Sequence, residues 1–141
     1  MSTPYGLNLP GSYAVDATIT GLTVTAGSIS PASAQYTNGG AAGSQISGQE
    51  FSVAVGYGST ISGGPAVIYV AHEVSTGVYE VTAVAWSFAH IATPQASTTL
   101  TRNFQWKKPG NFVVYVGNPS GNSSLTGVTL RNRPITRSFG S

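Results

Sequence analysis

The sequence predicts an all-β protein: an antiparallel sandwich of two sheets, jelly-roll-like, with an extended arm at each end. Apolar and polar residues alternate with a period of two through most of the chain, whereas apolar residues at helical spacing are hard to find. Gly, Pro, Asn and Ser interrupt this alternation at short intervals, which favours about eight strands joined by turns. A chain of 141 residues is long enough for one domain with one core.

We divide the chain into an N-terminal arm at residues 1–12, a β-sandwich domain at residues 13–132 and a basic C-terminal tail at residues 133–141. The first range holds Pro4, Pro10 and several polar residues, so it fits an extended segment outside the sheets. The last range is predicted to reach toward a neighbouring molecule.

The first part of the sandwich has the weaker pattern. Residues 12–27, "SYAVDATITGLTVTAG", alternate well enough for one long strand or for two strands broken at Gly21. Residues 28–49, "SISPASAQYTNGGAAGSQISGQ", are rich in Gly, Ser, Ala and Asn, so we expect an exposed loop or a mobile insertion there.

From residue 50 the alternation is clearer. "FSVAVGY" places Phe51, Val53, Val55 and Tyr57 on one face, as a half-buried strand requires. "KKPG" and "NPSGNS" are predicted turns. Further strands are predicted in "AVIYVAHEV", "VYEVTAVAWSFAHI", "STTLTRNFQW", "NFVVYVG" and "SLTGVTLRNR".

The hairpin at residues 70–81, "VAHEVSTGVYEV", gathers a histidine and two acidic residues around a turn. A two-residue turn at Thr76-Gly77 would place Glu73 opposite Glu80, where like charges destabilise the pair. A three-residue loop would instead place His72 opposite Glu80. The sequence leaves this choice open.

No residue pattern in the chain points to catalysis, and we expect a protein that is not an enzyme and needs no cofactor. Two facing glutamates in the hairpin would be the basis for a metal or glycosidase site, but the neighbourhood lacks further oxygen ligands. Asp16 is the only aspartate, so a catalytic triad would have to unite it with His72 or His90 and a serine, and no G-x-S-x-G elbow is present. "GYGSTISGG" lacks the G-K-S/T ending of a phosphate-binding loop.

Charged residues are few and are sorted along the chain. Only 7% of residues are charged, which favours association because little net charge keeps molecules apart. All four acidic residues precede Val81 and all six basic residues follow it, a pattern that suits head-to-tail contact. Five of the basic residues are candidates for docking on a protein partner: Arg131, Arg133, Arg137, Lys107 and Lys108. The alternatives are a solvated tail and nucleic-acid binding.

The chain has no cysteine, so disulfides and thiolate chemistry are excluded. Its start lacks the basic and apolar regions of a signal peptide, and no apolar run reaches the roughly 20 residues of a membrane span. We therefore expect a product made in the cytoplasm, with no membrane partner.

With an arm at residues 1–12, alternating strands at 13–132 and a basic tail from Arg131, the chain resembles the decoration, or cement, proteins of tailed-bacteriophage heads. Those proteins are small, cysteine-poor, β-rich modules that bind the outer capsid surface and clamp neighbouring capsomers. The resemblance implies a viral structural protein on the outer surface of the head, made in the host cytoplasm. It implies the major capsid protein and further copies of this chain as partners, and no nucleic acid.

Two other functions fit the same composition. A carbohydrate-binding, lectin-like sandwich would use an aromatic platform, for which the candidates are Tyr57, Tyr69, Tyr79, Trp86 and Trp106. A phage tail or fibre subunit would form a stable homotrimer.

Overall fold

The computed structural model describes residues 7–10, 12–39, 44–57, 64–87 and 98–138, and these ranges confirm the all-β sandwich. Within them, no helix is long and apolar enough to cross a membrane. The strands are β1 (Leu7–Pro10), β2 (Ala14–Val15), β3 (Leu22–Val24), β4 (Ser28–Ile29), β5 (Tyr36–Asn38), β6 (Ser44–Tyr57), β7 (Val67–Ser75), β8 (Val78–Ser87), β9 (Thr98–Trp106), β10 (Gly110–Asn118) and β11 (Leu125–Ser138).

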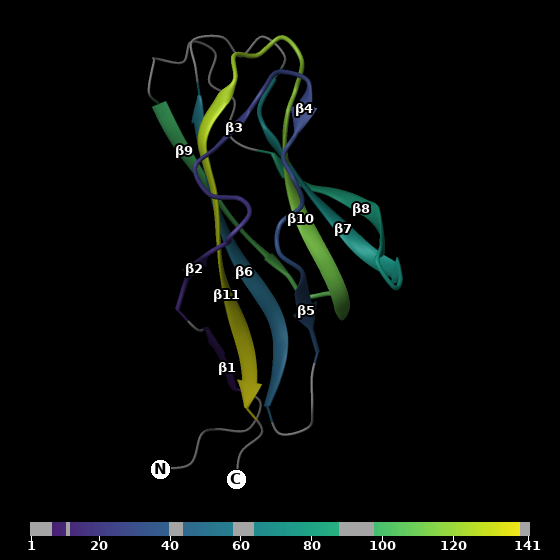
Figure 1. Ribbon diagram of the computed structural model, residues 1–141. Coiled ribbons are helices and arrows are strands. Elements are labelled where there is room, and N and C mark those ends of the chain that lie inside the picture. The colour runs from purple at the N-terminus through teal and green to yellow at the C-terminus, as the bar shows by residue number, and fades with distance from the viewer. Residues whose placement is uncertain (1–6, 11, 40–43, 58–63, 88–97, 139–141) are drawn as a thin grey trace.

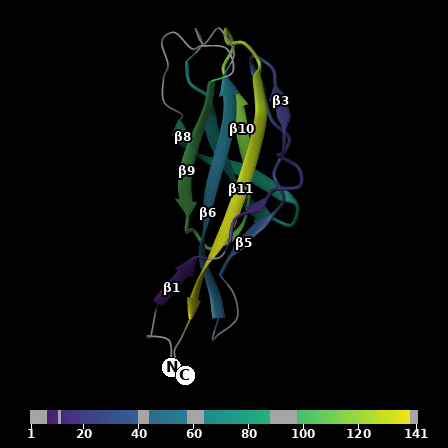
Figure 2. The same ribbon diagram turned by 90° about the vertical axis from the view of Figure 1, so that its left-hand side faces the viewer.

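The strands form two antiparallel sheets packed face to face (Figure 1). The first sheet has the order β1-β11-β6-β9, and β2 and β3 pair with β11 as well; β11, β6 and β9 lie side by side in Figure 2. The second sheet has the order β4-β10-β7-β8, with β5 also paired to β10. The chain thus pairs from its ends inward, β3 with β11, β5 with β10, β6 with β9 and β7 with β8, as in a long hairpin rolled into a jelly roll.

The core lies between the inner faces of the two sheets. In β6, the alternation predicted from the sequence is confirmed, because Phe51, Val53, Val55 and Tyr57 are all buried. Phe51 packs against three other rings: Phe104 at 4.9 Å, Tyr36 at 5.1 Å and Phe112 at 5.9 Å between centroids. Aliphatic side chains fill the rest of the core, chiefly Ile19, Ile68, Val70, Val114, Val116, Leu125, Val128 and Leu130.

The Gly/Ser-rich range 28–49 is not the loop that we predicted, because β4, β5 and the start of β6 lie in it. Two serines explain why it is ordered against β10. The Ser30 hydroxyl accepts the backbone N–H of Val116 at 2.9 Å, and the Ser33 hydroxyl accepts that of Val114 at 2.8 Å. These hydroxyls replace the carbonyls that a regular strand would offer, so the buried amides of β10 are satisfied.

Parts of both predicted arms lie in the first sheet. Residues 7–10 form β1, which pairs with residues 135–138 at the end of β11. Residues 133–138, predicted as tail, continue β11 and pair with β6 on the other side of the strand. These residues lie in the sheet because strands on both sides of β11 pair with its backbone N–H and C=O groups, which a free arm would leave to water. Residues 1–6 and 139–141 lie outside the described residues.

Residues 12–27 form two short strands rather than one, as the second of our alternatives required. The break is wider than a single glycine: the chain leaves the sheet after Val15 and returns at Leu22. Asp16 and Ile19 of this excursion are buried, and Ile19 belongs to the core.

Candidate binding groove

Of the basic residues predicted to dock on a partner, Arg133 has contacts within its own sheet. Its Nη2 atom lies 2.8 Å from Oε2 of Glu50, and its Nε donates to the same oxygen at 2.8 Å. The guanidinium also lies 4.4 Å from the centre of the Tyr13 ring, a cation–π contact. At this pair, an acidic and a basic residue that are far apart along the chain are neighbours in space.

The other basic candidates lie on the same sheet and its adjoining turn. Lys107 and Lys108 are exposed in the turn from β9 to β10. The Asn38 amide donates to the carbonyls of Trp106 and Lys108 at 2.9 and 3.0 Å, which fixes the backbone of this turn. Arg131 is exposed in β11.

Arg137 also lies in β11, where its backbone pairs with Asn8 and Gln45; its side chain is outside the described part.

The hairpin of β7 and β8 combines features of both predicted registers. Ser75 pairs with Val78 around a Thr76-Gly77 turn, in which Gly77 has a φ of +76°. A bulge between Glu73 and Ser75 then shifts the register, so that His72 lies opposite Glu80. The facing pair of carboxylates that a metal or glycosidase site required does not form.

Glu73 has a structural role in this hairpin. Its Oε1 accepts the Asn111 amide at 2.9 Å and its Oε2 accepts the Gly77 N–H at 3.2 Å. These hydrogen bonds, that from Asn111 first, hold the pKa of Glu73 below its ordinary value. Among the described residues, no group of three or more His, Cys, Asp or Glu is placed to hold a metal ion.

Asp16, the only aspartate, is engaged in structural hydrogen bonds. Its Oδ1 accepts the backbone amides of Thr18 and Ile19 at 2.8 and 2.9 Å. Its Oδ2 accepts the Ala34 amide at 3.0 Å and the Tyr36 hydroxyl at 2.5 Å. The carboxylate thus ties the excursion after β2 to the segment before β5, and it has no histidine among these partners. His90 lies outside the described residues.

Acid is expected to weaken this fold through Asp16. Burial alone would raise the pKa of its carboxyl, but the hydrogen bonds from Tyr36 and three backbone amides outweigh burial and hold the pKa below its ordinary value. The resulting stability is fully present above the unfolded-state pKa of about 3.9 and is lost as the pH falls through the lower folded-state pKa.

Thermal unfolding from pH 7 to pH 2 measures this loss, with the variant Asp16→Asn as the control. The difference in melting temperature between the two proteins should shrink below about pH 4. A difference that stays constant down to pH 2 would contradict the assignment.

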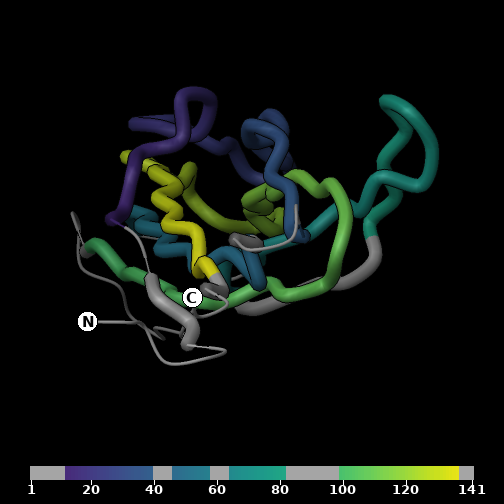
Figure 3. Tube along the Cα trace, turned by 90° about the horizontal axis from the view of Figure 1, so that it is seen from below, coloured from purple at the N-terminus to yellow at the C-terminus, as the bar shows by residue number. Residues whose placement is uncertain are grey.

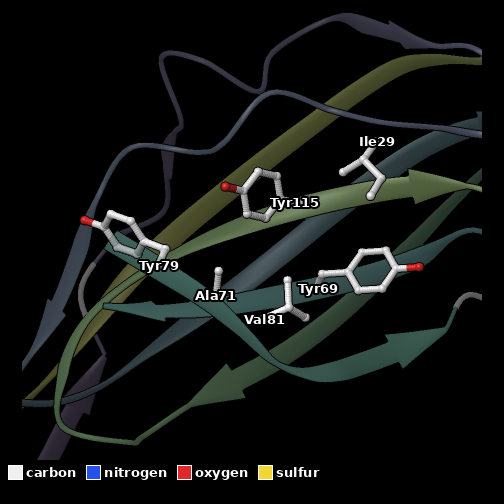
Figure 4. Close-up of a pocket in the computed structure, with 6 residues that line it drawn as sticks. All are labelled: Ile29, Tyr69, Ala71, Tyr79, Val81 and Tyr115. Atoms are coloured by element: carbon white, nitrogen blue, oxygen red, sulfur yellow. The ribbon is translucent and has the colours of Figure 1, made fainter. Parts of the chain in front are cut away.

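A groove open to solvent runs over the outer face of the second sheet (Figure 4). One part of it has a volume of about 250 Å³, and Ala71, which is buried, is among its lining residues. Tyr69 and Tyr115 are cross-strand partners in the ladder of β7 with β10, and Val81 of β8 lies opposite Ala71. The remaining lining residues of this part are Ile29 and Tyr79.

The groove continues past Tyr69 toward the turn after β10. This second part has a volume of about 330 Å³ and shares Ile29 and Tyr69 with the first. Gly117 lies beneath the Tyr69 ring: a Cβ atom at position 117 would be 2.7 Å from Cε2 of Tyr69. The glycine therefore lets the ring lie against the strand. The other lining residues are Gly27, Ser28, Val67, Asn118, Pro119 and Ser120.

Two of the five aromatic residues proposed from the sequence as a sugar platform line this groove, namely Tyr69 and Tyr79. Tyr57 is buried and its hydroxyl accepts the Ala66 N–H at 3.0 Å, and Trp106 packs against the core. The side chain of Trp86 lies outside the described part. Sequence reasoning missed Tyr115, because "NFVVYVG" is apolar on both faces and its alternation does not say which face is inside.

The hydrophobic residues at the hairpin tip are a separate exposed feature. The ladder between β7 and β10 ends at His72, whereas β7 and β8 continue to the turn, so the tip extends past β10. Figure 3 shows this hairpin, coloured teal, projecting from the two layers. Val74 and Val78 near its turn are 51% and 50% exposed.

No protein-family model matches the chain, and no curated protein matches it. Among solved structures, it is similar to the CBM22-1 xylan-binding domain of Xyn10C from Paenibacillus barcinonensis, with 12% identity, a TM-score of 0.35 and 97% of each chain covered. It is also similar to a chain of infectious bursal disease virus, Gt strain, with 8% identity and a TM-score of 0.32; the similarity covers 100% of this chain and 42% of that chain. The β-sandwich fold is consistent with both.

Proposed function

We propose that this protein is a non-catalytic viral structural protein, a decoration protein that binds the outer surface of a phage head. In this proposal its partners are the major capsid protein and further copies of itself, and it clamps neighbouring capsomers. A rigid jelly roll supplies the body, and exposed features at its edges make the contacts.

The projecting hairpin is the observation that carries the proposal. Val74 and Val78 lie beyond the end of the β7–β10 ladder, where they remain about half exposed. Apolar side chains that project in this way lose water contact when they enter a pocket on another protein. Glu73 accepts a hydrogen bond from Asn111 of β10, so the base of the hairpin is attached to the sheet. The hairpin therefore loses little conformational entropy when it binds.

Binding to heads from a phage strain that lacks this protein tests the proposal. Wild-type protein should co-sediment with these heads up to a saturating number of copies. The double variant Val74→Ser/Val78→Ser should bind at least about tenfold more weakly, because burying the exposed half of two valines contributes on the order of 2 kcal/mol. Val15→Ser is the matched control, since Val15 is 50% exposed on the first sheet. Failure of the wild type to bind, or equal binding by the double variant, would contradict the proposal.

The same assay tests the turn from β9 to β10, which carries Lys107 and Lys108. Lys107→Gln/Lys108→Gln should weaken attachment and reduce its dependence on salt, since both side chains are exposed and available to an acidic partner. Removing residues 131–141 is a poorer test, because β11 pairs with β6 and with β1 over this range and the sheet would be broken.

A further inference from the structure

We propose that the groove on the outer face of the second sheet is a binding site for a neutral oligosaccharide, with Tyr69 and Tyr115 as its stacking platform. This inference concerns a different surface from the hairpin tip and does not depend on attachment to a phage head.

The tyrosines of the groove are not core residues. In β7, Ile68 and Val70 point inward and are fully buried, so Tyr69 between them faces outward. In β10, Val114 and Val116 are fully buried in the same way, and Tyr115 lies between them. The two tyrosines are direct cross-strand partners, so their side chains start from neighbouring positions on the solvent side, and their rings point away from each other (Figure 4).

The platform is held in place before any ligand arrives. Tyr69 lies over Gly117, the position at which any side chain would collide with the ring. Tyr79, at the far end of the same part of the groove, donates its hydroxyl to Oε1 of Gln35 at 2.8 Å. Aromatic side chains that are already positioned lose little conformational freedom on binding.

Charge decides which class of ligand fits. Among the residues that the structure describes, those that line the two parts of the groove include no Asp, Glu, Lys, Arg or His. A nucleic acid, an acidic polysaccharide or a charged peptide would therefore leave its charges without partners there. A neutral sugar has no such charges to satisfy.

The distribution of polar atoms also fits a sugar. The hydroxyl of Tyr69 points toward one end of the first part of the groove, while those of Tyr79 and Tyr115 point toward the other (Figure 4). Between them lie the apolar side chains of Ala71 and Val81. A pyranose ring has the same character, with a face of C–H groups that packs on aromatic rings and a rim of hydroxyls that hydrogen-bonds. Because the groove continues past Tyr69 and is open to solvent, it suits a chain of sugar units.

Titration calorimetry of the full chain tests this site, with neutral hexasaccharides of glucose, xylose, mannose and N-acetylglucosamine as probes and polygalacturonate as the charged comparison. At least one neutral hexasaccharide should bind, and polygalacturonate should not. Tyr69→Ala and Tyr115→Ala should each weaken binding about tenfold or more. Tyr13→Ala is the matched control, since Tyr13 is a 37% exposed tyrosine just before β2, outside the groove, and it should bind as the wild type does.

Two further variants separate loss of the platform from loss of the fold. Tyr69→Phe keeps the ring and should retain most of the affinity. Gly117→Ala keeps every aromatic residue but displaces the Tyr69 ring, and it should weaken binding while the circular dichroism spectrum is unchanged. Absence of binding to every neutral hexasaccharide would overturn the proposal. So would binding that Tyr69→Ala and Tyr115→Ala leave intact, or a wild-type dimer in sedimentation analysis that only these two variants abolish.

Discussion

Replacing Asp16 with alanine is expected to lower the free energy of unfolding by about 3 to 5 kcal/mol, a large part of the total stability of a domain of this size. The reason is the number of donors that depend on one carboxylate. The backbone amides of Thr18, Ile19 and Ala34 and the Tyr36 hydroxyl all donate to Asp16, which is itself only 3% exposed. After truncation, all four donors would lose their acceptor; the Ile19 hydrogen bond is buried and the other three are partly buried.

Urea unfolding followed by circular dichroism measures this effect. Glu80→Ala is the control, because Glu80 is an exposed acidic residue and its removal should change the stability by no more than about 0.5 kcal/mol. Asp16→Asn should fall between the wild type and Asp16→Ala, since an amide oxygen still accepts hydrogen bonds but the amide nitrogen does not. A loss below about 1 kcal/mol in Asp16→Ala would show that the network contributes little.

Replacing Phe51 with alanine is expected to cost about 3 to 5 kcal/mol, through lost burial and the cavity that remains. Phe51 is fully buried and is in contact with Phe104, Tyr36 and Phe112. It comes from β6, which pairs with β11 and β9 in the middle of the first sheet, so its surroundings cannot easily collapse into the space.

The same urea titration measures this loss, and Phe51→Leu serves as the milder variant. Leucine fills much of the volume, so Phe51→Leu should keep more than half of the stability that Phe51→Ala loses. Tyr13→Ala, which removes an aromatic ring from a more exposed position, should have a much smaller effect. Equal effects at positions 51 and 13 would contradict the central role of the Phe51 cluster.

The hairpin illustrates how a local feature can change a functional interpretation. One bulge between Glu73 and Ser75 decides that His72 lies opposite Glu80, and so removes the carboxylate pair on which a metal or glycosidase site depended. Turn residues predicted the turn itself correctly. The register above the turn depends on how β7 also pairs with β10, which is information from residues about 40 positions away.

The prediction of a loop at residues 28–49 was wrong for a related reason. Gly, Ser, Ala and Asn have low strand propensity, so composition favours a loop. Ser30 and Ser33 are nevertheless ordered because their hydroxyls accept the amides of Val116 and Val114. Such hydrogen bonds connect residues more than 80 positions apart, and no local pattern indicates them.

The all-β class, the turns at "KKPG" and "NPSGNS" and the inward face of β6 could be predicted from the amino-acid sequence, because alternation and turn chemistry are properties of neighbouring residues. Which tyrosines face solvent, how far the hairpin projects and which groups donate to Asp16 depend on contacts between distant parts of the chain. In β7 and β10 both faces carry apolar residues, so the period of two exists without saying which face is inside. That choice is made when strands far apart in the chain pair, and it is this choice that separates the core from the groove.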